Sequence, residues 1–218
     1  MTPGSLFPRR LAALCNRAWF PIACGAVWLG TTMAGMAILW KTENVPGIQM
    51  AVPARWPAAS HIAPAPGIPT LVMFAHPRCP CTRASVGELE RLIAQCNGRV
   101  RAHVIFYKPR GASDQWAQAD LWRSAAAIPG MDVRCDEEGA EAARFGATTS
   151  GFVVVYDASG QLRFSGGITA ERGHSGDNEG RSAIVAILNG QPPRLTSTPV
   201  FGCSFFGPGS KCVKGVAD

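Results

Sequence analysis

The hydrophobic residues of this chain follow two patterns, one long uncharged run near the N-terminus and a series of shorter runs after it. The uncharged run, WFPIACGAVWLGTTMAGMAILW, covers residues 19–40. A helix rises about 1.5 Å per residue, so this run is long enough to cross a hydrocarbon core of about 30 Å. Trp19 and Trp40 stand at its ends, where indole rings favour the lipid headgroups. The pattern predicts one transmembrane helix over residues 19–40.

The charges on either side of this run predict its orientation. Three arginines precede it, whereas Lys41 follows it together with the acidic Glu43. Positive flanks stay in the cytoplasm, so residues 1–18 are expected there and the rest of the chain outside. A cleaved signal peptide is the alternative, but the run is longer than a usual signal-peptide core and no small-x-small cleavage site ends it. We therefore expect an uncleaved signal-anchor.

The remaining chain divides into a linker, a domain and a tail. Residues 41–68 are rich in proline and have neither helical nor strand periodicity, which predicts a tether or a covering segment. Residues 69–190 alternate between short apolar runs and amphipathic segments, as one domain does. Residues 191–218 are rich in Pro, Gly and Ser, and are expected to form a tail without regular structure.

The order of elements within residues 69–190 predicts an α/β fold. Apolar runs typical of buried strands cover residues 69–75, 100–107, 131–135, 152–156 and 161–165. Helical periodicity or capping signals cover residues 82–95, 113–128, 137–145 and 178–188. Alternating strands and helices imply parallel crossovers, and the turn at residues 157–160 adds an antiparallel hairpin. We expect a three-layer sandwich around one mixed sheet.

The charge balance argues against nucleic acid as a partner. The chain carries a net charge of +6, with 21 Lys and Arg against 15 Asp and Glu. Three of the arginines precede the apolar run, so the rest of the chain is only mildly basic, and its charges are scattered. We find no basic block or aromatic-interleaved basic stripe of the kind that binds nucleic acid.

Two of the eight cysteines lie at the junction between a predicted strand and a predicted helix. In the segment HPRCPCTRAS, Cys79 and Cys81 follow the first strand directly. Unpaired N–H groups and the macrodipole at a helix N-terminus stabilise negative charge, which favours a thiolate at Cys79. Pro80 suits the first helical position because its missing N–H would have no partner there. The motif predicts a redox-active centre.

Three charged or titratable residues flank this motif. Arg78 and Arg83 add positive potential that would lower the pKa of the thiol, or they are solvated surface charges. His76 either assists the site or lies on its rim.

The segment LVMFAHPRCPCTR, in which Cys79 follows Phe74 by five residues, resembles the thioredoxin superfamily. The particular likeness is to membrane-anchored extracytoplasmic thioredoxin-like proteins of the RedB type, over roughly residues 69–190. It implies a thioredoxin-like sandwich and thiol–disulfide oxidoreductase activity without a cofactor, with Cys79 as the attacking nucleophile. It also implies protein thiols or disulfides as partners, an unidentified electron donor or acceptor, and a bacterial inner-membrane protein with its domain in the periplasm.

This sequence departs from the superfamily pattern at two positions. The second cysteine comes one residue early, and Thr82 stands where the family has its resolving cysteine. Gly151 stands before the 152–156 strand, where thioredoxins have a cis-proline that holds the substrate backbone. A disulfide between Cys79 and Cys81 would span one residue, depart from relaxed geometry and be easy to reduce, which favours an oxidant or isomerase.

The other cysteines have less distinctive positions. Cys15 and Cys24 lie before or within the apolar run, Cys96 falls on the apolar face of the first domain helix, and Cys135 ends a strand. Two hypotheses stay open for the tail: Cys203 pairs with Cys212, or Cys203 reaches Cys79 and Cys81 as a third redox or metal group.

The same cysteines support a second functional hypothesis. Soft thiolates bind Cu(I), so Cys79 and Cys81 with His76 or Cys203 could form a ligand set for copper binding or delivery. A peroxidase is disfavoured because the chain lacks a Pro-x-x-x-Thr-x-x-Cys arrangement, and a redox-silent binding module would not need the cysteine pair.

Overall fold

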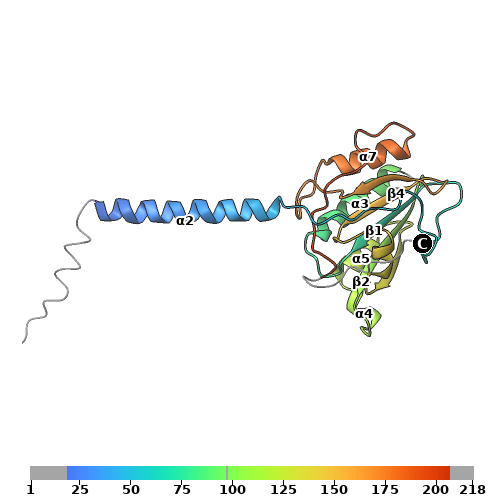
Figure 1. Cartoon of the computed structure of the whole chain (residues 1–218), viewed down its shortest axis with the longest axis horizontal. Coiled ribbons are helices and arrows are strands. Elements are labelled where there is room, and N and C mark those ends of the chain that lie inside the picture. Colours follow the sequence, from blue (N-terminus) through green and yellow to red (C-terminus); the bar gives the residue numbers. More distant parts are fainter. Residues whose placement is uncertain (1–18, 97, 207–218) are drawn as a thin grey trace, which may run out of the picture. The chain divides into compact units, whose positions relative to one another are not determined.

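The computed structural model describes residues 19–96 and 98–206, which belong to two compact units that meet between Asn44 and Val45. In the first unit, α2 (Trp19–Glu43) is a single continuous helix with every side chain exposed (Figure 1). It is long and apolar enough to cross a membrane. It contains the whole run predicted to be helical and continues through Glu43.

The second unit, Val45–Asp218, is built on a five-stranded mixed sheet. Its strands are ordered β3-β2-β1-β4-β5. The central strand β1 runs parallel to β2, which runs parallel to β3, and antiparallel to β4, which forms a hairpin with β5. The bounds are β1 (Thr70–Ala75), β2 (Arg101–Lys108), β3 (Asp132–Glu137), β4 (Phe152–Tyr156) and β5 (Leu162–Gly166). The predicted mixed sheet, including its hairpin, is confirmed.

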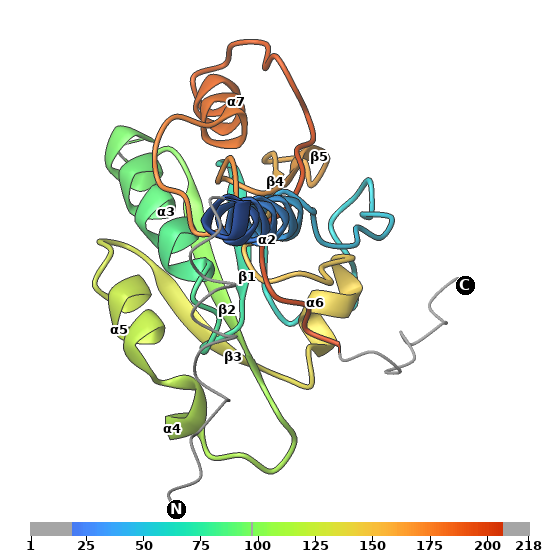
Figure 2. The ribbon, with the colours of Figure 1, turned by 90° about the vertical axis from the view of Figure 1, so that its left-hand side faces the viewer.

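The longer helices of this unit cover one face of the sheet, and a short helix lies on the other (Figure 2). The first layer contains α3 (Thr82–Cys96), α5 (Asp120–Ala126) and α7 (Glu179–Leu188). Their apolar faces pack on alternate residues of the strands, so that Leu89 and Ile184 meet Met73 in one buried cluster. Burial of this kind contributes about 25 cal/mol per Å² of apolar surface, and it fixes α3 over β1.

The opposite face is covered by α6 (Ala140–Arg144) together with irregular chain. The ring of Trp56, from the proline-rich segment, packs edge-on against Phe145 and Tyr156 at 5.1 and 5.2 Å between centroids. Ile62 is 2% exposed in the same cluster, which also contains Val200 from the tail. Since α6 is a single short helix, the proline-rich segment covers the face that it leaves open. The compact unit therefore includes residues on both sides of the range 69–190.

Two predicted helices differ from those observed. The segment predicted as one helix over residues 113–128 forms α4 (Asp114–Ala117) and α5, because Gln118 between them has a ψ of 45° and breaks the helix. The helix predicted over residues 137–145 begins only at Ala140, since β3 runs on to Glu137 and Gly139 adopts a left-handed φ of 72°.

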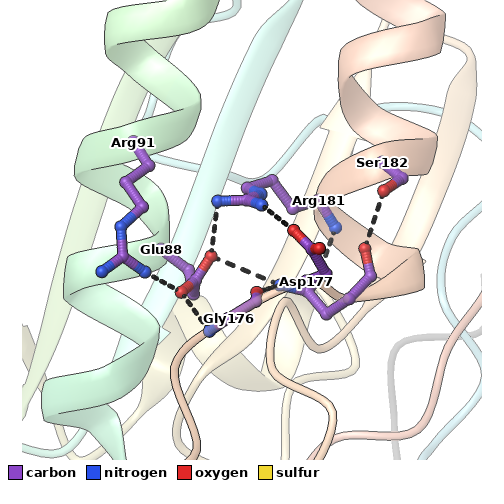
Figure 3. Close-up of polar contacts among 7 residues, drawn as sticks. Glu88, Arg91, Gly176, Asp177, Arg181 and Ser182 are labelled. Atoms are coloured by element: carbon purple, nitrogen blue, oxygen red, sulfur yellow. Dashed lines mark hydrogen bonds and ion pairs between the residues drawn. The ribbon is translucent and has the colours of Figure 1, made fainter.

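A buried carboxylate joins α3 to α7 and to the loop before it (Figure 3). Glu88 is fully buried, and its Oε2 lies 2.9 Å from Nη1 of Arg181 on α7. Its Oε1 accepts the backbone N–H of Gly176 at 2.9 Å and also pairs with Arg91. Asn178, which caps α7 by accepting the N–H of Arg181, donates its side-chain amide to Oε2. These bonds hold the loop before α7 against α3.

We predict that Glu88→Gln lowers the free energy of unfolding by about 3 kcal/mol, because it breaks a buried ion pair and leaves Arg181 with only the exposed Asp177 as its acidic partner among the described residues. The measurement is urea unfolding of the full chain in detergent, followed by tryptophan fluorescence. Glu90→Gln, at an exposed position of the same helix, is the matched control and should leave stability unchanged. Equal stability of the two variants would contradict the role given to Glu88.

Candidate active site

The cysteine motif forms the connection between β1 and α3. Backbone N–H groups of Thr82, Arg83 and Ala84 donate to the carbonyls of Cys79, Pro80 and Cys81, at 3.2, 3.3 and 3.2 Å. These tight turns lead directly into the first turn of α3, which begins at Thr82. Cys79 is completely buried, whereas Cys81 is half-buried and Pro80 is exposed. The motif therefore lies at a strand–helix junction, as its sequence context predicts.

Two side chains act on the Cys79 sulfur, those of Thr82 and Cys203. The Sγ atoms of Cys79 and Cys203 lie 3.0 Å apart. Burial raises the pKa of Cys79, but hydrogen bonds from the side chains and backbones of Thr82 and Cys203 outweigh it, so the net shift is downward. Burial and the neighbouring Cys79 raise the pKa of Cys203 to about 12. Of the two thiols, Cys79 is therefore the one that ionises more readily.

Cys203 reaches the site because the chain beyond α7 pairs with the loop before β4. The N–H of Ser150 donates to the carbonyl of Cys203 at 2.8 Å, and Thr149 and Ser204 form an antiparallel bridge. Gly202 permits this close approach, since a Cβ there would lie 1.9 Å from the carbonyl oxygen of Ser150. The structure thus brings Cys203 to Cys79, while Cys212 lies outside the described residues.

Arg172 is a member of the site that the sequence did not single out. Its guanidinium hydrogen-bonds the Cys81 side chain and donates to the carbonyls of Gly202 at 2.7 Å and Val45 at 3.2 Å. Burial and the charge of Cys79 raise the pKa of Cys81, and Arg172 opposes that rise only in part. Cys81 is therefore less ready to ionise than Cys79.

The loop before β4 is tied to the motif through Ser150 and Gly151. The hydroxyl of Ser150 accepts the N–H of His76 at 2.7 Å and lies 2.5 Å from the hydroxyl of Thr82. Gly151 donates its N–H to the carbonyl of Phe74 at 2.8 Å, with a φ of 90°. Proline has no N–H and a fixed negative φ, so it satisfies neither requirement. Gly151 therefore extends the pairing between β1 and β4, and Ser150 is one of the residues of this loop that contact the tail.

The flanking charges predicted to act on Cys79 have other contacts. The ring of His76 stacks on Tyr107 at 5.6 Å, and its Nδ1 accepts the N–H of Arg78 at 3.2 Å. Burial, with a smaller effect of Arg78, lowers the pKa of His76. The guanidinium of Arg78 lies over the ring of Trp116, 4.6 Å from its centroid, and Arg83 is exposed. The largest effects that lower the pKa of Cys79 are hydrogen bonds from Thr82 and Cys203.

The remaining described cysteines lie elsewhere. Cys96, on α3, is 3% exposed and lies in the buried cluster between the sheet and the layer of α3, α5 and α7. Burial raises its pKa. Cys135 is half-buried on β3, and Cys24 is exposed on α2. Cys15 lies outside the described residues. Within residues 19–96 and 98–206, no group of three or more His, Cys, Asp or Glu side chains is arranged to hold a metal ion. The copper hypothesis stays a prediction.

No protein-family model matches the chain, and no curated protein matches it in sequence. Solved structures do align with it. A hypothetical protein from Sinorhizobium meliloti 1021 is 20% identical, with a TM-score of 0.56, over 72% of this chain and 96% of its own. An uncharacterized conserved protein from Geobacillus kaustophilus is 20% identical, with a TM-score of 0.54, over 77% of this chain and 96% of its own.

The structural neighbours also include thioredoxin-like disulfide oxidoreductases. One, a secreted disulfide oxidoreductase from Mycobacterium tuberculosis, is 22% identical, with a TM-score of 0.36, over 44% of this chain and 67% of its own. Likenesses at such identities concern the fold alone. With its β3-β2-β1-β4-β5 sheet between helices, the unit that begins at Val45 has a thioredoxin-like fold.

Proposed function

We propose that this protein is a membrane-anchored, extracytoplasmic thiol–disulfide oxidoreductase in which Cys79 is the nucleophile. The observation that carries the proposal is the position of Cys79 at the strand–helix junction, with a lowered pKa and a second thiol 3.0 Å away. A thiolate is the form of cysteine that attacks disulfides, and a neighbouring thiol can complete the exchange. The fold agrees with this chemistry but does not by itself imply it.

The reaction that this site supports begins with attack of the Cys79 thiolate on a disulfide of a protein substrate. One substrate sulfur leaves as a thiolate and takes up a proton, while the other stays bound to Cys79 in a mixed disulfide. A second thiol of the site then attacks Cys79 Sγ and releases the second substrate sulfur. The same steps in reverse order oxidise a dithiol of a protein substrate. The direction of electron flow depends on the physiological partner.

The membrane part of the proposal rests on α2 and its flanking charges. The helix carries no charge until Lys41, and the three arginines of the chain's first 40 residues all precede it. This asymmetry favours a cytoplasmic N-terminus, and it supports our proposal that the domain lies in the periplasm of a bacterial inner-membrane protein. A compartment outside the cytoplasm is also one where protein disulfides form and persist.

We predict that Cys79→Ser abolishes disulfide exchange because the nucleophile is lost. The assay is the reduction of insulin disulfides by dithiothreitol, catalysed by the full chain in detergent. Wild type should accelerate it, Cys79→Ser should return the rate to the uncatalysed level, and Cys135→Ser should behave as wild type. A fully active Cys79→Ser protein would refute the proposal. Tight Cu(I) binding that Cys79→Ser removes, with no exchange activity in wild type, would favour the copper function instead.

We predict that Thr82→Val raises the pKa of Cys79, because it removes one of the two side-chain hydrogen bonds that lower this pKa. A hydrogen bond to a charged group contributes about 1.5 kcal/mol, which corresponds to an upward shift of about 1 pH unit. The measurement is the pH dependence of iodoacetamide alkylation at Cys79, read by mass spectrometry in a Cys81→Ser background. Thr82→Ser keeps the hydroxyl and should keep the midpoint. Identical midpoints for the valine and serine variants would exclude the role of the hydroxyl.

We predict that residues 19–40 stay in the mature protein as a membrane anchor. After expression in a Gram-negative host, the full chain should remain in membranes through alkaline carbonate extraction. An alkaline phosphatase fused to its C-terminus should be active, because that enzyme folds only in an oxidising compartment. A soluble product that lacks residues 19–40 would show a cleaved signal peptide, and an inactive fusion would contradict the orientation.

A further inference from the structure

The segment that covers Cys79 comes from the far end of the chain. Cys79 has no exposed surface, and the sulfur of Cys203 lies 3.0 Å from its own. We call residues 202–205, which carry Cys203 across this site, the tail strap. Cys203 itself is exposed, so the strap lies between Cys79 and solvent. The two cysteines are 124 positions apart in the sequence.

Specific contacts hold the tail strap in place at both ends. Its backbone exchanges hydrogen bonds with the loop before β4, since Ser150 donates to Cys203 at 2.8 Å and Phe205 donates to Thr148 at 2.9 Å. Arg172 fixes its first residue through the bond to the carbonyl of Gly202. The ring of Phe205 is 7% exposed and stacks on Tyr107 at 6.2 Å between centroids. The strap is therefore a positioned segment, and Cys203 faces Cys79 because of these contacts.

Cys81 is a poorer partner for Cys79 than Cys203 is. A bond between Cys79 and Cys81 would span one residue within the tight turn that starts α3, where disulfide geometry is unfavourable. The Cys81 side chain is instead engaged by Arg172. Cys203 approaches from a separate segment of chain, so it is free of this restriction.

We propose that the redox disulfide of this protein forms between Cys79 and Cys203, with the tail strap as the resolving segment and Cys81 as a neighbour that stays reduced. This inference rests on the proposed oxidoreductase function and names the second thiol of its cycle. It assigns Arg172 and Ser150 as positioning residues for the strap.

The chemistry balances with a protein disulfide as the oxidant. Cys79 thiolate attacks the substrate disulfide, one S–S bond breaks, and the first substrate sulfur leaves and is protonated. The Cys203 thiol then loses its proton to solvent and attacks Cys79 Sγ, which forms the Cys79–Cys203 bond and releases the second substrate thiolate. Two cysteine thiols are thus oxidised to one disulfide, and one substrate disulfide is reduced to two thiols. Because the strap covers Cys79, it must move aside to admit the substrate. It must then return so that Cys203 can resolve the mixed disulfide at Cys79.

The direct test is disulfide mapping of the full chain in detergent after oxidation by oxidised glutathione. Trypsin places Cys79 and Cys81 together in the peptide CPCTR and Cys203 alone in the peptide LTSTPVFGCSFFGPGSK. We expect these two peptides to be linked in wild type and to remain linked in Cys81→Ser, with Cys79 as the only cysteine available in the first. Cys81→Ser should keep insulin-reducing activity, whereas Cys203→Ser should lose most of it and accumulate mixed disulfides at Cys79.

The outcomes separate this inference from the function on which it depends. An active protein whose oxidised form contains a bond between Cys79 and Cys81, or one between Cys203 and Cys212, overturns the inference and leaves the oxidoreductase function standing. A protein without exchange activity in any variant refutes the function itself. Linkage that is lost in Cys81→Ser also overturns the inference.

A second variant tests the strap without removing a thiol. Gly202→Ala places a Cβ against the carbonyl of Ser150 and should displace the strap, so that Cys79 is alkylated severalfold faster and the Cys79–Cys203 bond forms in lower yield. Gly87→Ala is the matched control, because a Cβ at Gly87 meets no atom within 4 Å. If Gly202→Ala matches Gly87→Ala in both readouts, the strap does not position Cys203.

Discussion

The approach of the Cys203 sulfur to within 3.0 Å of the Cys79 sulfur is the contact on which the site depends. A buried group resists ionisation unless hydrogen bonds compensate for the water that it loses. At Cys79 that compensation comes from Thr82, at the start of α3, and from Cys203, near the far end of the chain. The position of the motif at a helix start is therefore only part of the explanation. Its ionisation depends on tertiary structure that brings the tail to the motif.

Much of the surrounding structure maintains this approach. The loop before β4 receives the tail through Ser150, whose hydroxyl also bonds Thr82 and so links the tail to the motif. Arg172 contacts both Cys81 and the carbonyl of Gly202, and its loop is held against α3 by the buried Glu88. The site thus combines four segments that are distant in sequence: the cysteine motif, the loop before β4, the loop that carries Arg172, and the tail.

The sequence predicted those features that depend on local pattern. Apolar runs such as residues 152–156 identified the strands, and the cysteine motif identified the strand–helix junction. Patterns could not show that Gln118 would interrupt a helix, nor decide whether the proline-rich segment was a tether or a covering segment. The second result depends on packing between segments that are far apart in the chain.

The same distinction applies within the site. Cys203 was recognisable as a candidate because a cysteine can act as a redox or metal group wherever the fold brings it to a second cysteine. Arg172 and Ser150 were not, since a polar residue in a loop has no pattern that marks it, and their roles depend on the contacts of the folded chain. Arg78 and Arg83 were predicted either to lower the pKa of Cys79 or to be solvated surface charges, and in the folded chain Arg78 lies over Trp116 and Arg83 is exposed.

The most direct test of the central claim is a pH titration of thiolate absorbance in the reduced full chain. The account predicts one thiol that ionises below the usual range for cysteine, is absent in Cys79→Ser, and ionises at higher pH in Cys203→Ser. A low-pKa thiolate that persists in Cys79→Ser, or one that is unaffected by Cys203→Ser, would contradict the account.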